Sequence, residues 1–138
     1  MSLSNIFGIS GSAMAAENVR MNVTASNLAN AQSVGSDENS TYRARQPVFS
    51  TLINDDFDAA EQVAGVRVDR IDERQGELTK EFNPGHPLAD ADGFITNTNV
   101  NTVEEMSNLI AASRAYQNNV EVMKTAKDLM MKTLELAE

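Results

Sequence analysis

The chain has 138 residues, of which 41% are hydrophobic and 22% charged, a composition that suits one modest domain and argues against complete disorder. Its formal net charge of −9 argues against a nucleic-acid partner, because phosphate binding requires clustered Lys and Arg. Cysteine is absent, which excludes disulfides and thiolate metal sites. No apolar run reaches the length of a membrane-spanning helix, and the N-terminus lacks the pattern of a cleavable signal peptide.

Residues 1–34 form the first predicted unit, an N-terminal helix whose only charges are Glu17 and Arg20. Large apolar residues recur in it every seven positions, with smaller residues between them, so a partner helix can approach closely. A second apolar stripe on another face indicates a helix that is deeply buried or contacted from two sides. Because Ser, Asn and Gly lower helix propensity, we expect this helix to need a covering partner. The first stripe is Phe7, Met14, Met21 and Leu28; the second is Ile9, Ala13, Ala16 and Val23.

Residues 35–101 form an acidic middle with 13 acidic and 6 basic residues, which we interpret as a solvated face. Residues 65–70 alternate apolar with polar, as a half-buried strand does. Residues 41–53 and 77–82 are further strand candidates, so the middle holds a hairpin or a small sheet. Residues 83–87 have the turn chemistry of a loop, and residues 33–40 are predicted to be a mobile connection.

Chemical sites are not indicated in the middle. His86 is the only histidine, and one histidine without cysteine makes no metal site. Asp90, Asp92 and Gly93 are arranged as a polar turn, because a calcium loop requires a later glycine and a glutamate at its twelfth position. The acidic cluster at residues 55–58 has the surroundings of an exposed loop. We therefore predict no catalytic residue, no cofactor and no metal.

Residues 102–138 form the last predicted unit, one long helix that begins at Thr102 with Glu105 as the partner in a capping box. Mostly apolar residues follow one another at spacings of three and four without a break. A sustained period of 3.5 residues is typical of the contact stripe of a coiled coil. The positions are Met106, Leu109, Ser113, Tyr116, Val120, Met123, Lys127, Met130, Leu134 and Ala137.

The lengths of the two helices predict how they pack. Helices of about 36 and about 27 residues span roughly 54 Å and 40 Å. A middle of about 70 residues is too small to cover both, so the helices must pack on each other, on neighbouring subunits, or both. The predicted fold class is therefore α+β, with two long terminal helices forming a coiled coil and a small β-containing middle.

Three stretches resemble the family of flagellar axial proteins, which includes the rod and hook subunits. The run Asn27-Leu28-Ala29-Asn30, with its flanking residues 24–31, is similar to the N-terminal signature of that family. Residues 103–106, 115–119 and 124–126 resemble its C-terminal helix. The linker of Pro84-Gly85-His86-Pro87, Gly93 and Asn99-Val100-Asn101 is similar to that of proximal rod members.

The resemblance implies a structural subunit of the proximal rod of the bacterial flagellar basal body, and not an enzyme. Such a subunit is exported unfolded through the flagellar type III apparatus and polymerises helically, with itself and other rod proteins, in the periplasm. Its terminal helices form the inner layer of a rod that transmits torque from motor to hook. A secreted coiled-coil adaptor or effector using the same export route is the alternative, although an adaptor needs only one contact stripe.

The predicted assembly interface combines the apolar stripes with the two amides of the signature. Asn27 and Asn30 have two open interpretations: they cap the end of the first helix, or they bond to the backbone of a neighbour. The full set is Phe7, Met14, Met21, Asn27, Leu28, Asn30, Met106, Leu109, Tyr116, Val120, Met123, Met130 and Leu134.

Overall fold

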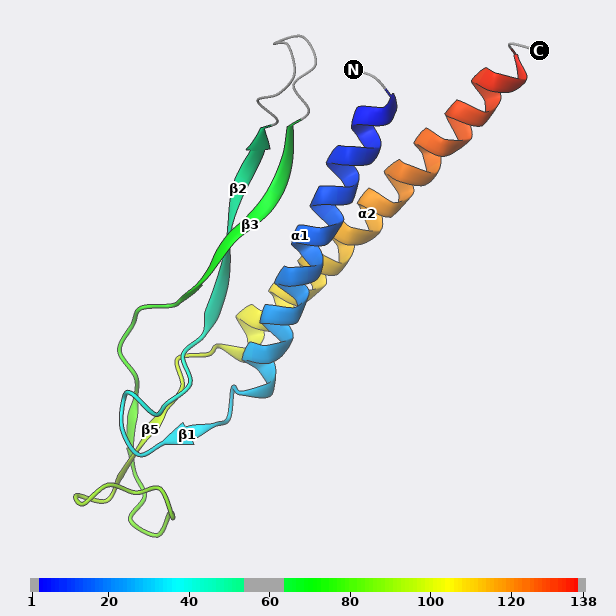
Figure 1. Ribbon diagram of the computed structural model, residues 1–138. Coiled ribbons are helices and arrows are strands. Elements are labelled where there is room, and N and C mark those ends of the chain that lie inside the picture. The colour runs from blue at the N-terminus through cyan, green and yellow to red at the C-terminus, as the bar shows by residue number, and fades with distance from the viewer. Residues whose placement is uncertain (1–2, 54–63, 137–138) are drawn as a thin grey trace.

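The computed structural model describes residues 3–53 and 64–136, and it shows two long helices beside a slender β region (Figure 1). The α+β class predicted from the sequence is confirmed, with one long helix at each end of the chain. The elements in chain order are α1 (Leu3–Ala29), β1 (Val34–Gly35), β2 (Arg45–Ile53), β3 (Ala64–Glu73), β4 (Lys80–Phe82), β5 (Phe94–Asn97) and α2 (Thr102–Glu135).

Helix α1 lies between α2 and the hairpin of β2 and β3, and it runs antiparallel to α2 (Figure 1). It contacts α2 on one side and both strands of the hairpin on the other. The expectation of a helix covered from two sides is therefore met within the chain. This cover explains how a sequence with poor intrinsic propensity forms 27 residues of helix, because packing of a helix contributes more to its stability than propensity does. Supercoiling of the pair remains a prediction.

Two small antiparallel sheets make up the middle. Strands β2 and β3 pair from Arg45↔Glu73 to Ile53↔Ala64, with a bulge between Val48 and Phe49. Strand β5 pairs with β1 on one side and with β4 on the other. The predicted strands at residues 41–53, 65–70 and 77–82 correspond to β2, β3 and β4, whereas β5 was not predicted. The acidic cluster at residues 55–58 lies outside the described residues.

The connection after α1 is more ordered than the sequence suggested. Residues 33–40, predicted to be mobile, contain β1 and a turn organised by Asp37. The Asp37 carboxylate accepts hydrogen bonds from the backbone amides of Asn39 (2.8 Å) and Ser40 (2.7 Å). A short polar side chain satisfies the backbone of the turn, and the chain before it pairs with β5; mobility of the segment stays a prediction.

Helix α2 begins as predicted at Thr102, but its cap is the preceding residue. Asn101 has extended backbone angles, and its side-chain oxygen accepts from the amides of Val103 (3.0 Å) and Glu104 (3.2 Å). Asparagine is among the strongest N-cap residues. The predicted capping box of Thr102 and Glu105 is therefore wrong, and the Glu105 side chain is free to bond elsewhere.

The buried apolar core of the described residues consists mostly of small side chains. Alanine predominates in it, and no Leu, Met or Phe of the described residues is fully buried. Its members are Ala16, Val23, Ala44, Ile95, Ala112 and Ala126. Small side chains let helices approach closely, and they leave the large apolar residues of α2 on its outside.

Candidate assembly interface

The stripe of α2 that contacts α1 differs in part from the stripe predicted by periodicity. Leu109, Tyr116 and Met123 of the predicted stripe are half-buried, as a contact position would be. At the alternate positions the buried residues come one place earlier, and they are Glu105, Ala112 and Ala126. The predicted Met106 and Val120 are 57% and 43% exposed, and Met130 and Leu134 are also exposed. These outward residues are available to a partner outside the chain.

Helix α1 shows the same division between small buried residues and larger half-buried ones. Phe7, Met14, Met21 and Leu28 each lie half-buried. The fully buried positions of α1 are occupied instead by Ser10, Ala16, Val23, Thr24 and Asn27. Ala16 and Val23 belong to the second stripe, so that stripe supplies more of the contact within the chain. The role of the predicted residues in contacts between subunits remains a prediction.

Asn27 is the centre of a hydrogen-bonded cluster that joins three elements. It is only 1% exposed. Its amide nitrogen donates to the backbone oxygen of Arg45 (2.8 Å) and to Oε2 of Glu105 (3.0 Å). Its amide oxygen accepts from the Tyr42 hydroxyl (2.9 Å) and from the Arg45 backbone amide (2.9 Å). Both N–H donors and both acceptor positions of the amide are thereby used. We call Asn27, Tyr42, Arg45 and Glu105 the Asn27 cluster.

Asn30 has the simpler of the two roles that the sequence left open. Its amide nitrogen donates to the backbone oxygen of Ser26 (2.8 Å), four residues earlier, and so satisfies a carbonyl at the end of α1. Asn27, by contrast, bonds to the backbone of Arg45 in β2 of the same chain. The two asparagines of one motif therefore act differently, one locally and one between elements.

A second set of contacts attaches the start of α2 to the base of the hairpin. The Asn99 side chain accepts from the Ala44 amide (2.8 Å) and donates to the Arg74 carbonyl (3.0 Å). The Arg74 guanidinium donates to both carboxylate oxygens of Glu104, each at 3.0 Å. The sequence did not predict these contacts of Glu104, Glu105 and Arg74, since their partners lie tens of residues away; Glu105 was assigned a capping role instead. Asn99 was singled out only as part of the linker.

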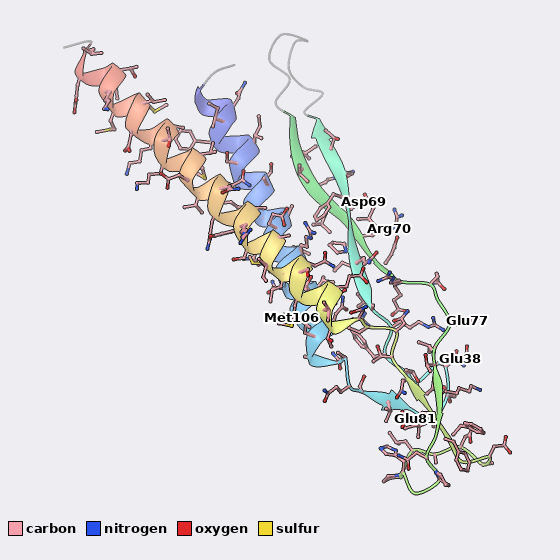
Figure 2. All side chains as sticks on the ribbon, turned by 180° about the vertical axis from the view of Figure 1, so that it is seen from behind. Glu38, Asp69, Arg70, Glu77, Glu81 and Met106 are labelled. Carbon is pink, nitrogen blue, oxygen red and sulfur yellow. The ribbon has the colours of Figure 1, made fainter. Side chains whose placement is uncertain are left out.

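Exposed apolar side chains gather on the outside of α2. Val103, Met106 and Ile110, which we call the outer stripe, are 72%, 57% and 54% exposed. Figure 2 shows Met106 on the side of α2 turned away from the hairpin, which carries Asp69 and Arg70. Further along, Val122 and Leu129 line an apolar groove with Ile6 of α1. Exposed apolar patches of this kind mark surfaces that bind other proteins.

The β region carries most of the acidic residues, and several of them face solvent. Glu38, Asp69, Glu77 and Glu81 are all exposed, and Figure 2 places them along the β side of the molecule. His86 and Asp90 lie in the loop between β4 and β5, where Asp90 accepts from the Phe94 amide (2.8 Å). Among the residues described, no group of three or more metal-ligating side chains gathers into a possible site.

Comparison with known proteins agrees with the resemblance on which the prediction rests. Residues 7–35 match the family model for flagella basal body rod protein, and residues 91–136 match that for the C-terminal region of the flagellar basal body rod FlgEFG proteins. Flagellar basal-body rod protein FlgC of Escherichia coli O157:H7 is 48% identical over 138 residues, covering all of both chains. The FlgC proteins of Yersinia enterocolitica and Salmonella typhimurium are 47% and 46% identical over the same full length.

The chain belongs to the FlgC family of flagellar basal-body rod proteins. As a member of the FlgC family it is a structural rod subunit, and the secreted-adaptor alternative is not favoured. The first matched region contains most of α1 with Asn27 and Asn30, and the second contains β5 and α2. None of the described helices is long and apolar enough to cross a membrane.

Proposed function

We propose that this FlgC-family subunit polymerises helically with itself and with other rod proteins in the proximal rod, through the outward faces of α1 and α2. The rod so formed transmits torque from the motor to the hook. The observation that carries the proposal is the exposed outer stripe of Val103, Met106 and Ile110. These side chains lie on a helix whose contact with α1 is already formed by small residues.

Energetics supports an external partner for this face. Burying a side chain such as Val, Met or Ile contributes roughly 1.5–3 kcal/mol, and that stabilisation is forgone while the outer stripe faces water. A contact with a neighbouring subunit recovers it. The half-buried Phe7, Met14, Met21 and Leu28 of α1 can add to the same interface, as can Leu109, Tyr116 and Met123.

The route and the destination follow from the same proposal. The subunit passes unfolded through the flagellar type III export apparatus, without a cleaved signal peptide, and assembles in the periplasmic part of the basal body. The low helix propensity of α1 supports this route, since a chain whose first segment orders only against partners is easily kept unfolded. The acidic β region then faces outward. The subunit acts as a building block and not as an enzyme.

The experiment compares Met106→Asp in α2 with Gln75→Asp, at an exposed position between β3 and β4. Met106→Asp places a charge in the outer stripe, so we expect loss of the chain from purified hook–basal bodies and loss of swimming. Unfolding free energy should change by no more than about 0.5 kcal/mol, because the side chain touches little within the chain. Mass spectrometry of hook–basal bodies and urea unfolding measure the two effects.

Gln75→Asp is the control, because it adds the same charge away from the two helices and should assemble normally. Normal rods built from Met106→Asp would contradict the assignment of the outer stripe to the interface. Absence of the wild-type chain from hook–basal bodies, together with its presence free outside the cell, would instead support the secreted adaptor.

A further inference from the structure

The contact between α1 and α2 contains little that fixes how far one helix slides along the other. Besides Glu105, the buried residues that α2 contributes to it are small, Ala112 and Ala126. On α2 they fall on a seven-residue repeat, through Glu105, Ala112 and Ala126. Small side chains at repeating positions offer similar surfaces after a shift of seven residues. Packing of these small residues by itself therefore discriminates weakly between the native alignment and shifted ones.

One polar contact breaks this repetition. The bond from the Asn27 amide to the Glu105 carboxylate, 3.0 Å long, is the only hydrogen bond between α1 and α2 in the part of the chain that the structure describes. Both side chains are buried, at 1% and 3% exposure. Buried polar pairs specify helix alignment because every other alignment leaves them without partners.

Shifting the helices shows what the contact excludes. A slide of seven residues in one direction places Asn27 opposite Ala112, which cannot accept a hydrogen bond from its side chain. A slide in the other direction places Asn27 beyond the start of α2 at Thr102. Either shift takes the buried Asn27 amide away from its acceptor on α2, which is costly for a buried polar group.

The hairpin reinforces the same alignment from the other side. The Asn27 side chain forms two hydrogen bonds with the backbone of Arg45, the first residue of β2. The neighbouring Ala44 is held to the start of α2 through Asn99. The contacts thus form a closed path from α1 to β2, from β2 to α2, and from α2 back to α1 through Glu105.

We propose that Asn27 is a positioning residue that sets the axial alignment of α1 against α2. The alignment decides which side chains of the two helices face outward, so it bears on assembly. Asn27 sets it within a single chain, however, and its test requires neither a rod nor the proposed interface.

Electron paramagnetic resonance on the free chain measures the alignment. The chain has no cysteine, so Ala15→Cys and Ala111→Cys, at two exposed positions of α1 and α2, provide the only sites for spin labels. A slide of seven residues moves one label along the axis by about 10 Å, which double electron–electron resonance resolves. The otherwise wild-type labelled chain should give a single narrow distance distribution.

Asn27→Asp is the decisive variant because it keeps the size of the side chain and both its bonds from Tyr42 and Arg45. It replaces the donating nitrogen with a charged oxygen that faces both Glu105 and the backbone oxygen of Arg45, so rescue by a change at Glu105 is needed to separate the two effects. We expect the native distance to lose about tenfold or more of its population relative to other distances. Adding Glu105→Gln supplies a donor to the introduced carboxylate and should restore part of the native population. Glu105→Gln alone retains the acceptor and should change nothing.

Asn30→Asp is the matched control, since it makes the same substitution in the same motif at a residue whose side chain, within the described part of the chain, bonds only to the Ser26 carbonyl. It should keep the native distance. The proposal is overturned if Asn27→Asp retains a single native distance, if Asn30→Asp disturbs it equally, or if the labelled chain without either substitution shows no single distance. If Asn27→Asp unfolds the chain, recovery of the native distance on adding Glu105→Gln supports the proposal, and lack of recovery overturns it.

Discussion

Asn27 lies near the C-terminal end of α1, and Asn101 immediately precedes the start of α2. Their side chains are the same, but one stabilises a contact between elements and the other stabilises a helix end. Asn101 bonds to the backbone of its own helix and fixes where α2 begins. Asn27 bonds to β2 and α2 and fixes what lies beside α1. The first role is local, since N-cap preference depends on neighbouring residues, although the sequence analysis placed the cap one residue late, at Thr102. The second could not be predicted, because Glu105 lies 78 residues away in the sequence.

Asp37 shows the same local chemistry in the turn after β1, and its ionisation can be followed. The hydrogen bond from the Ser40 backbone amide, followed by the Ser40 side chain, lowers the pKa of Asp37 below its usual value. A lowered pKa in the folded chain means that this turn is stabilised above the unfolded pKa and loses that contribution as pH falls through the folded value.

We therefore expect Asp37 to titrate at a lower pH than an aspartate in an unstructured peptide. The amide resonances of Asn39 and Ser40 should shift with the same midpoint, because both donate to its carboxylate. Nuclear magnetic resonance titration of the side-chain carboxyl and these amides measures it. A midpoint at or above the peptide value would show that the bonds do not persist in solution.

At the scale of elements, the sequence predicted which segments form helices and strands better than which faces they bury. The helices and β2, β3 and β4 follow from periodicity and from β-forming residues, which are local signals. The buried face of α2 does not follow, since the stripe was drawn through large residues such as Met106. Where helices approach closely, Ala112 and Ala126 occupy the contact instead. Alanine gives almost no periodic signal, so the phase of the stripe was predicted one residue late at alternate positions.

This explanation predicts unequal effects of enlarging two neighbouring alanines in α2. Ala112 is 0% exposed, whereas Ala111 is exposed. Ala112→Leu inserts a large side chain between α1 and α2, and we expect a loss of about 1–3 kcal/mol in unfolding free energy. Ala111→Leu should change it by less than about 0.5 kcal/mol, because the added side chain lies in solvent. The two substitutions alter helix propensity equally, so the difference between them reports packing. Urea unfolding of both variants measures the difference, and equal losses would contradict the close approach of the helices at Ala112.

At the scale of the whole molecule, α2 is longer than the surface that covers it. Glu105 meets Asn27 near the end of α1, and Ala126 and Leu129 share a groove with Ile6 near its start. Beyond that point every described residue of α2 is exposed, including Met131 and Leu134 at 52% and 61%. Figure 1 shows this end of α2 extending past α1 and the described part of the hairpin. The free chain thus carries an apolar helical end for which the described residues provide no cover.

Ending the chain at Leu129 separates folding from assembly at this scale. The truncation removes residues that make no buried contact in the described chain, so the unfolding temperature should change little, and the loss of circular dichroism at 222 nm should match the deleted helix alone. Incorporation into hook–basal bodies should be lost, because the exposed Met131 and Leu134 are the last apolar contacts that α2 offers to a neighbour.

The same cells should swim once the full-length chain is supplied. Truncated chains that build working rods would assign assembly to the outer stripe and α1 alone, while a collapse of the unfolding temperature would show that this end of α2 stabilises the free chain.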